Sequence, residues 1–239
     1  MTTRSAQGPL EFERTQELIR QHVSGGRVLD VGGGTGVHAR ALQRAGFEID
    51  LVDPVPKHVE QARTAGVSEH VGDARALEFP DGSFDATLLL GPLYHLSALE
   101  DRRQALQEAA RVTRSGGVVF ASALSRYVAF GALSLTESVP EELPDDWAAL
   151  ITQGVPSPDT RFPAGHFHSA EELEEELIDA GYTDVVVHGV EGPAGLMLEV
   201  ARDLPDEVRI AARTIARAAS DCPGIRDQSA HLLAIGVVP

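Results

Sequence analysis

The amino-acid sequence predicts an α/β fold in which helices cover both faces of a mainly parallel sheet. Short apolar runs alternate with amphipathic segments between residues 11 and 122, and this alternation is typical of βαβ units. The apolar runs are nearly continuous, as expected for strands that are buried on both faces. Crossover connections between such strands are expected to be right-handed.

The first elements follow from apolar spacing and from glycine. Apolar residues at helical spacing predict a helix over 11–23. The apolar run at 27–31 predicts a strand, and a glycine-rich turn follows it. The helix expected over 37–45 ends at Gly46, because glycine is favoured just past a helix end. A second apolar run predicts a strand over 47–53.

Proline and further apolar runs define the next elements. A helix over 56–65 begins with proline, which the first helical turn tolerates. Apolar runs predict strands over 68–73 and 84–90. Small apolar residues that share one face predict a helix over 101–112. The sequence "SGG" then predicts a turn before a strand over 118–122.

The regular pattern changes after residue 122. Residues 123–168 are irregular and rich in proline but keep apolar residues, which favours an inserted cap over a linker. We expect a single domain over 1–239, with a second insertion at about 191–230. The remaining expected elements are helices over 169–180 and 206–219 and strands over 183–190 and 231–238.

Composition limits the classes of partner. The formal net charge is −16, which disfavours a nucleic-acid backbone or an anionic membrane as a partner. The chain has one cysteine, Cys222, so an intramolecular disulfide is excluded. We expect a cytoplasmic protein, because we find neither a signal-peptide pattern nor an apolar run of membrane-spanning length. Monomer and homodimer both stay open.

The sequence "VLDVGGGTG" places a glycine turn between a strand and a helix. Such a turn presents backbone N–H groups and a positive helix end to a cofactor. A dinucleotide-binding turn needs a glycine at position 37, where this chain has Val37. The glycines present are Gly32, Gly34 and Gly36, and Asp30 precedes them.

Further motifs follow in order. Asp53 ends the second strand in "LVDP", where a carboxylate can accept hydrogen bonds from both hydroxyls of a ribose. The sequence "GDARAL" follows the third strand, "FDATLLLGPLYHL" contains the fourth, and "EAARVTRSGGVVFAS" contains the fifth. These motifs cover about residues 25–122.

Together these motifs resemble those of the class I S-adenosylmethionine-dependent methyltransferases. The local sequences "GPLYHL" and "SAHLLAIG" are similar to bacterial members that act on small molecules. The resemblance implies a Rossmann-like seven-stranded sheet of order 3-2-1-4-5-7-6, with the last strand antiparallel. It also implies S-adenosyl-L-methionine as the cofactor.

The resemblance assigns expected roles to the motif residues. The glycines allow close approach of the cofactor, Asp53 binds its ribose, and Asp73 takes the adenine amino group. Asp30 either braces the turn by accepting backbone N–H bonds or reaches the cofactor amino group through water. The predicted cofactor-binding residues are Asp30, Gly32, Gly34, Gly36, Asp53, Pro54, Asp73, Ala74, Leu90 and Gly91.

Other polar residues are candidates for catalysis or acceptor binding. Tyr94 and His95 lie in the loop that the resemblance places beside the reactive methyl group. His95 acts there as a general base or only packs within the loop, because alignment alone suffices for many methyl transfers. Arg126 pairs with an acidic acceptor or with a structural partner. His166 and His168 either line the acceptor pocket or have a structural role at the start of the helix that follows. We expect no metal at these histidines.

The favoured function is methyl transfer to the oxygen, nitrogen or carbon of a small molecule, by in-line attack in a lidded pocket. Methylation of RNA or protein is the second enzymatic hypothesis. A third hypothesis is that the protein binds the cofactor or its product without transferring the methyl group. A nicotinamide oxidoreductase is disfavoured because position 37 is not glycine.

Overall fold

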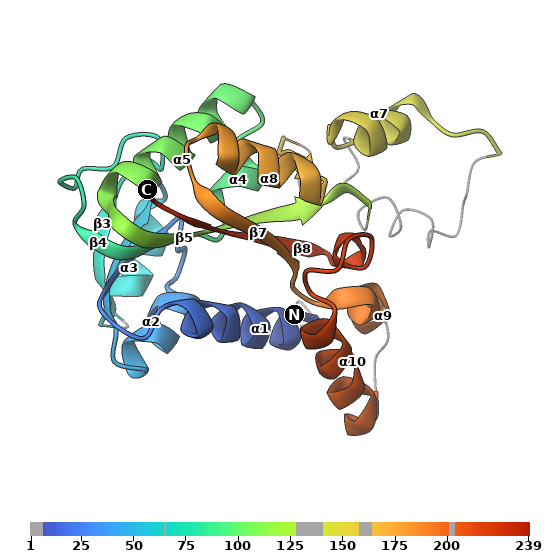
Figure 1. Cartoon of the computed structure of the whole chain (residues 1–239), viewed down its shortest axis with the longest axis horizontal. Helices are drawn as coiled ribbons and strands as arrows, with labels where there is room; N and C mark the ends of the chain where they lie inside the picture. The colour runs from blue at the N-terminus through green and yellow to red at the C-terminus, as the bar shows by residue number, and fades with distance from the viewer. Residues whose placement is uncertain (1–6, 65, 128–140, 158–163, 201–203) are drawn as a thin grey trace. The chain divides into compact units, whose positions relative to one another are not determined.

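The computed structural model describes residues 7–64, 66–127, 141–157, 164–200 and 204–239 (Figure 1). The chain divides into two compact units. The first, the glycine-turn unit, comprises residues 16–122, 174–186 and 234–239. The second, the insertion unit, comprises residues up to 15 together with 123–173 and 187–233.

Parallel strands carry the glycine-turn unit. Strand β1 (Arg27–Val31) pairs with β2 (Glu48–Asp53) on one side and with β4 (Phe84–Leu89) on the other. Strand β3 (Ser68–Val71) extends the sheet beyond β2. Because these pairings are parallel, the carboxyl ends of β1, β2 and β4 lie at the same edge of the sheet.

The sheet continues through β5 (Thr113–Ser125), β8 (His231–Val237) and β7 (Thr183–Gly189). The full order is β3-β2-β1-β4-β5-β8-β7, with the short β6 (Phe167–His168) also paired with β5. Backbone bonds from Gly116 N–H to the Val238 carbonyl and from Ser125 N–H to the Ala230 carbonyl make β8 antiparallel to β5. The predicted order is therefore confirmed, and the unpredicted β6 only shifts the numbering.

The helices that the sequence predicts lie close to their predicted bounds, whereas helices over 92–95, 145–153 and 195–200 were not predicted. Figure 1 shows α2 (Val37–Arg44) and α5 (Leu99–Val112) on opposite sides of the parallel strands. Helix α5 carries acidic residues in its first turn and an arginine in its last, which complements the helix dipole. In the described part of the chain, five helices precede β5, and α8 follows β6. Their bounds are α1 (Gln7–His22), α2 (Val37–Arg44), α3 (Pro56–Thr64), α4 (Pro92–His95), α5 (Leu99–Val112) and α8 (Ala170–Asp179).

The turn predicted at "SGG" is wrong. Those residues belong to β5, which begins at Thr113 instead of Val118. The pairing with β4 shifts register between Phe84 and Ala86, so the glycines lie in an irregular part of the ladder. Gly116 has a φ of +72°, a conformation that costs glycine little. Between these pairs, four residues of β5 stand against one of β4, and backbone hydrogen bonds of Gly116 and Gly117 with Val238 continue the strand there.

The insertion unit contains α7 (Asp145–Gln153), η1 (Gly192–Ala194), α9 (Gly195–Val200), α10 (Asp206–Ala218) and η2 (Arg226–Gln228). Leu10, Leu198 and Ala212 form a small buried cluster there. Much of the first predicted insertion, residues 128–140 and 158–163, lies outside the described residues. The single domain with two caps stays a prediction.

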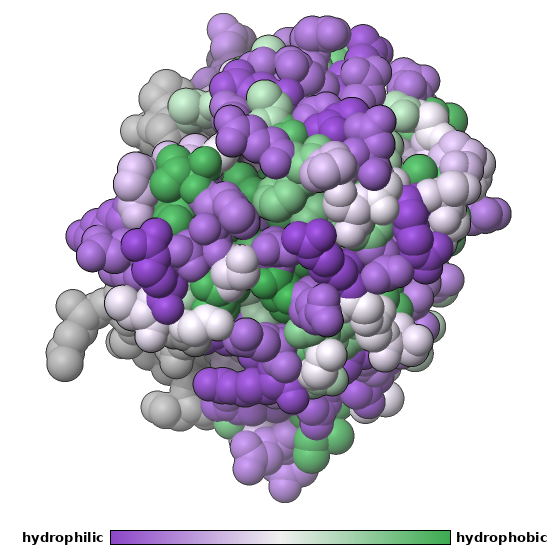
Figure 2. Space-filling model, turned by 90° about the vertical axis from the view of Figure 1, so that its left-hand side faces the viewer, coloured by the Kyte–Doolittle hydropathy of each residue, from purple (hydrophilic) through white to green (hydrophobic). Residues whose placement is uncertain are grey.

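Hydrophilic side chains cover most of the face drawn in Figure 2, and hydrophobic side chains show in smaller patches between them. Within the described ranges, none of the helices combines the length and the apolar character that a membrane span requires.

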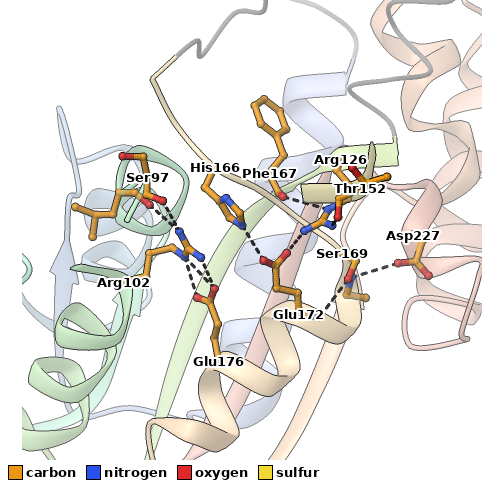
Figure 3. A network of polar contacts seen from close by, with 12 residues as sticks. Ser97, Arg102, Arg126, Thr152, His166, Phe167, Ser169, Glu172, Glu176 and Asp227 are labelled. Atoms are coloured by element: carbon orange, nitrogen blue, oxygen red, sulfur yellow. Dashed lines mark hydrogen bonds and ion pairs between the residues drawn. The ribbon is translucent and has the colours of Figure 1, made fainter. Parts of the chain in front are cut away.

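A buried ion pair joins α5 to α8 within the glycine-turn unit (Figure 3). The Arg102 guanidinium donates to both carboxylate oxygens of Glu176, at 2.6–3.0 Å. It also donates to the carbonyls of Leu96 and Ser97. Both charged side chains are almost fully buried. Because all these groups depend on one guanidinium, its removal leaves a carboxylate buried without its main partner.

We predict that Arg102→Met lowers the free energy of unfolding by about 3–5 kcal/mol, the typical cost of an uncompensated buried charge. Denaturant unfolding measures the change. Arg103→Met on the same helix removes only exposed pairs with Glu100 and Asp179, and we expect it to cost at most about 1 kcal/mol. Equal effects of the two variants would contradict the prediction.

Candidate functional site

The glycine turn after β1 is shaped by close contacts. Gly32, Gly34 and Gly36 all have positive φ values, between +57° and +76°, a region that glycine adopts most readily. A Cβ atom on Gly32 would lie 2.9 Å from the ring of Pro92, in the loop after β4. A Cβ atom on Gly34 would meet no atom within 4 Å. The turn therefore packs tightly on one side and is open at Gly34.

A cavity of about 600 Å³ opens at this edge of the glycine-turn unit, within the usual size range of small-molecule sites. It brings together residues from the ends of β1, β2, β3 and β4. The predicted site residues that line it are Gly32, Gly34, Asp53, Pro54, Asp73, Ala74, Gly91, Tyr94 and His95.

Asp53 reaches the cavity from the end of β2. Its side chain is almost fully buried, and donors lie at both carboxylate oxygens. The Gly34 N–H donates to Oδ2 at 2.9 Å, and the Val55 N–H donates to Oδ1 at 2.9 Å. Nδ1 of His58 lies 3.1 Å from the same Oδ1. These contacts hold the carboxylate plane in one orientation and tie it to the glycine turn.

Asp73 and Ala74 lie directly after β3. The Asp73 carboxylate accepts two hydrogen bonds from the side chain of Arg75, at 3.0 and 2.7 Å. Hydrogen bonding to Arg75 is the main reason that the pKa of Asp73 lies below its ordinary value. Asp73 is therefore an ionised acceptor on the cavity wall.

The loop after β4 supplies the opposite wall. Gly91 lines the cavity, whereas Leu90 is not among its lining residues. The Tyr94 hydroxyl lies 3.4 Å from the Leu90 carbonyl. The rings of Tyr94 and His95 are 4.8 Å apart and inclined by 47°. The two predicted catalytic side chains therefore stand next to each other at the cavity.

Asp30 and Gly36 are placed differently from the other predicted residues. Neither lines the cavity, and Gly36 is the N-cap residue before helix α2. The side-chain oxygens of Asp30 are buried without a hydrogen-bond partner of good geometry among the described residues. The backbone amide of Ala39 is close enough to act on the carboxylate, and the expected brace through backbone N–H bonds stays a prediction. Asp30 supports the turn by contact, because a Cβ on Gly33 would lie 2.7 Å from its carboxylate.

Burial changes the protonation of Asp30. Loss of solvation raises its pKa to about 7, and the nearby charge of Asp53 adds to the increase. The backbone amide of Ala39 offsets only part of this effect. Asp30 consequently exchanges its proton near neutral pH, unlike an exposed aspartate.

Several cavity residues were not predicted. His58 lies in the first turn of the helix after Asp53, and Arg75 lies two positions after Asp73. Proximity to a predicted acidic residue was the available signal for both, but spacing alone does not say which way a side chain points. The lining residues outside the predicted set are Val55, His58, Gly72, Arg75, Pro92 and Leu96.

The predicted acceptor residues Arg126, His166 and His168 lie in the insertion unit. Arg126 pairs with Glu172 and also donates to the Phe167 and Thr152 carbonyls (Figure 3). Nε2 of His166 lies 2.9 Å from Glu172. Burial alone would raise the pKa of Glu172, but hydrogen bonding to His166 and the neighbouring positive groups lower it overall. The structural pairing expected as one option for Arg126 is present, and acceptor binding by these residues stays a prediction.

Residues 29–121 match the family model described as a methyltransferase domain. The demethylmenaquinone methyltransferase of Paenarthrobacter aurescens is 30% identical over 192 residues, which cover 77% of this chain and 72% of that protein. The ubiquinone biosynthesis O-methyltransferase of Xanthomonas oryzae pv. oryzae is 33% identical over 123 residues. That match covers 48% of this chain and 50% of that protein, so the chain spans about half the length of this relative.

A crystal structure from Thermotoga maritima has a similar fold. It is described as an S-adenosylmethionine-dependent methyltransferase and a possible histamine N-methyltransferase. Its TM-score is 0.65 and its sequence identity 20%, over 97% of this chain and 92% of that chain. At this identity the similarity concerns the fold alone.

We predict that Asp30→Asn stabilises the protein increasingly as pH rises from 5 to 8. The folded-state pKa of about 7 lies above the ordinary 3.8, so the folded protein binds the proton more tightly than the unfolded chain. Wild-type stability therefore falls as pH rises through this window, by on the order of a few kcal/mol in total. The asparagine variant lacks this loss.

Chemical unfolding at several pH values measures the difference. Asp85→Asn is the control, because hydrogen bonding to Arg114 lowers the pKa of Asp85. The contribution of the Asp85 carboxylate to stability is therefore lost only in acid. The difference in unfolding free energy between Asp85→Asn and wild type should stay constant between pH 5 and 8. If the difference in unfolding free energy between Asp30→Asn and wild type is also constant over this range, the raised pKa of Asp30 is refuted.

Proposed function

This chain belongs to the S-adenosylmethionine-dependent methyltransferases, and we propose that it transfers the methyl group of this cofactor to a small-molecule acceptor. The observation that carries the proposal is the cavity at the carboxyl edge of the parallel strands. There the glycine turn, the acidic end of β2, the Asp73–Ala74 segment and the loop after β4 meet. In open α/β folds this edge is where ligands bind.

We propose the following contacts for the cofactor. The open face of Gly34 receives the ribose and carboxypropyl part, where a side chain would intrude. Asp53 accepts a ribose hydroxyl at Oδ2, which holds only the Gly34 N–H among the described contacts. Asp73 accepts from the adenine amino group, the Ala74 N–H faces the ring, and the Gly91 backbone contacts the methionine portion.

The acceptor is proposed from the relatives and from the charge. The two relatives reported above are named for ubiquinone biosynthesis and for demethylmenaquinone, which supports a small ring compound as acceptor. The net charge of −16 disfavours RNA, whose phosphates would be repelled. When bound, the cofactor supplies an electrophilic methyl group on a sulfonium.

Tyr94 and His95 are proposed to serve the acceptor side of the reaction. Their rings stand at the cavity on the short helix after β4. The imidazole of His95 takes the proton of a hydroxyl or amine acceptor, a role suited to histidine near neutral pH. Tyr94 forms the wall against which the acceptor is aligned.

We predict that Asp53→Asn weakens S-adenosylhomocysteine binding by roughly 1.5–3 kcal/mol, or at least about tenfold, through loss of a charged acceptor. Isothermal titration measures the affinity. Asp50→Asn is the control on the same strand, because Asp50 bonds to Arg27 and Ser68 and does not line the cavity. Unchanged affinity in Asp53→Asn would remove Asp53 from the ribose site.

The same titration tests the cofactor class. We expect the wild-type protein to bind S-adenosylhomocysteine at micromolar concentration and not to bind reduced nicotinamide cofactor. Binding of the nicotinamide cofactor alone would refute the proposed function.

We predict that His95→Ala lowers kcat by about 10²-fold or more while changing cofactor affinity little, because a general base acts in the chemical step. Transfer of labelled methyl groups to a panel of phenols, quinols and amines provides the rate. His70→Ala is the control, since His70 is half exposed and outside the cavity. A normal rate in His95→Ala would leave His95 with a packing role. Absence of transfer from a wild-type protein that binds the cofactor would instead support binding without catalysis.

A further inference from the structure

The carboxylate of Asp73 is held by one neighbouring residue. The Arg75 backbone N–H donates to Oδ1 at 2.9 Å, and its Nε donates to the same oxygen at 3.0 Å. Nη2 of Arg75 donates to Oδ2 at 2.7 Å. The guanidinium therefore binds the carboxylate in the two-pronged geometry that fixes the plane of both groups.

These contacts limit what else Asp73 can accept. An ionised carboxylate offers about four acceptor positions, two on each oxygen. Arg75 occupies both positions on Oδ1 and one on Oδ2. Among the contacts of the described residues, one acceptor position on Oδ2 is left, and Asp73 lines the cavity. An unrestrained carboxylate would instead rotate and accept donors from several directions.

Arg75 is itself held from helix α5. Its Nη1 donates to Oδ1 of Asp101 at 3.0 Å. The Gln104 side-chain amide donates to the Arg75 backbone carbonyl at 3.0 Å. Two positions on α5 thus anchor Arg75, and Arg75 anchors Asp73. Both Asp73 and Arg75 line the cavity, whereas Asp101 does not.

This arrangement contributes little to folding. The side chains of Asp73, Arg75 and Asp101 are each about 40% exposed, at 44%, 38% and 38%. Ion pairs with this exposure add little to stability. The ion pairs still have a geometric effect, because they hold the Asp73 carboxylate on the cavity wall in one orientation. Arg75 also keeps the pKa of Asp73 low, so that the carboxylate stays an acceptor.

We propose that Arg75, anchored by Asp101, is a positioning residue that aims the remaining acceptor of Asp73 and so makes the site select a purine with a 6-amino donor. This inference rests on the proposed function, because it takes the adenine of the cofactor as the ligand at Asp73. A purine without that amino group leaves the aimed acceptor unpaired, which costs affinity. Arg75 does not touch the reacting atoms.

The test compares two ligands by isothermal titration. One is S-adenosylhomocysteine, and the other is its analogue with hydrogen in place of the 6-amino group, which keeps the ring nitrogen that faces Ala74. We expect the wild-type protein to prefer the amino ligand by about tenfold or more. Asp73→Asn should reduce this ratio and sets the lower reference. Arg75→Met should bring the ratio of the two affinities close to the value for Asp73→Asn. Arg75→Lys and Asp101→Asn should give ratios between those of Arg75→Met and wild type.

A matched control separates positioning from charge and from folding. Arg103→Met also removes an exposed arginine that lies between two acids, Glu100 and Asp179, but one that does not line the cavity. It should keep the wild-type ratio. Thermal unfolding should show all variants folded with similar Tm, and Asp101→Asn serves if Arg75→Met does not fold.

The outcomes distinguish this inference from the proposed function. If Arg75→Met and Asp101→Asn both prefer the amino ligand as strongly as wild type does, the positioning role of Arg75 is overturned, while cofactor binding is unaffected. Equal loss of affinity for both ligands, with the ratio unchanged, would also overturn it. Failure of the wild-type protein to bind either ligand would instead refute the proposed function.

Discussion

The candidate site depends on how closely the turn after β1 approaches its neighbours. Gly32 leaves no room for a Cβ beside Pro92, and Gly33 leaves none above Asp30. Because the turn lies so near the loop after β4, the glycine backbone becomes a wall of the cavity. The open position at Gly34 follows from the same path, and its N–H reaches Asp53 at the end of β2. Larger side chains in the turn would separate these strand ends.

Three aspartates at this edge show how environment decides the behaviour of one residue type. Asp30 is fully buried, and the loss of solvation raises its pKa to about 7. Asp53 is also buried but accepts backbone N–H bonds from Gly34 and Val55. Asp73 is half exposed and is held by Arg75. One aspartate thus supports the turn, and the other two present oriented acceptors to the cavity.

Much of the site could be predicted because its residues lie at strand ends. Asp53 ends β2 and Asp73 lies two residues after β3, and parallel strands bring their carboxyl ends to one edge. The errors arose where a contact distant in sequence decides the outcome. The glycines at 116 and 117 signal a turn, yet backbone hydrogen bonds with Val238, directly after β8, keep them in β5. Arg126 follows a strand like the aspartates, but its guanidinium is engaged by Glu172 and by backbone carbonyls.

The sequence alone determined the succession of strands along the chain, the glycine turn and the acidic residues near the ends of β2 and β3, because periodicity and short motifs depend on neighbours in the chain. The order of the strands within the sheet was implied by the family resemblance. Only the tertiary structure decided that Asp30 is buried beneath Gly33, that His58 reaches Asp53, and that Asp101 on α5 holds Arg75. Those features depend on side-chain direction and on packing between elements distant in the chain. Local pattern does not encode either of these, because both are set only when the helices meet the sheet.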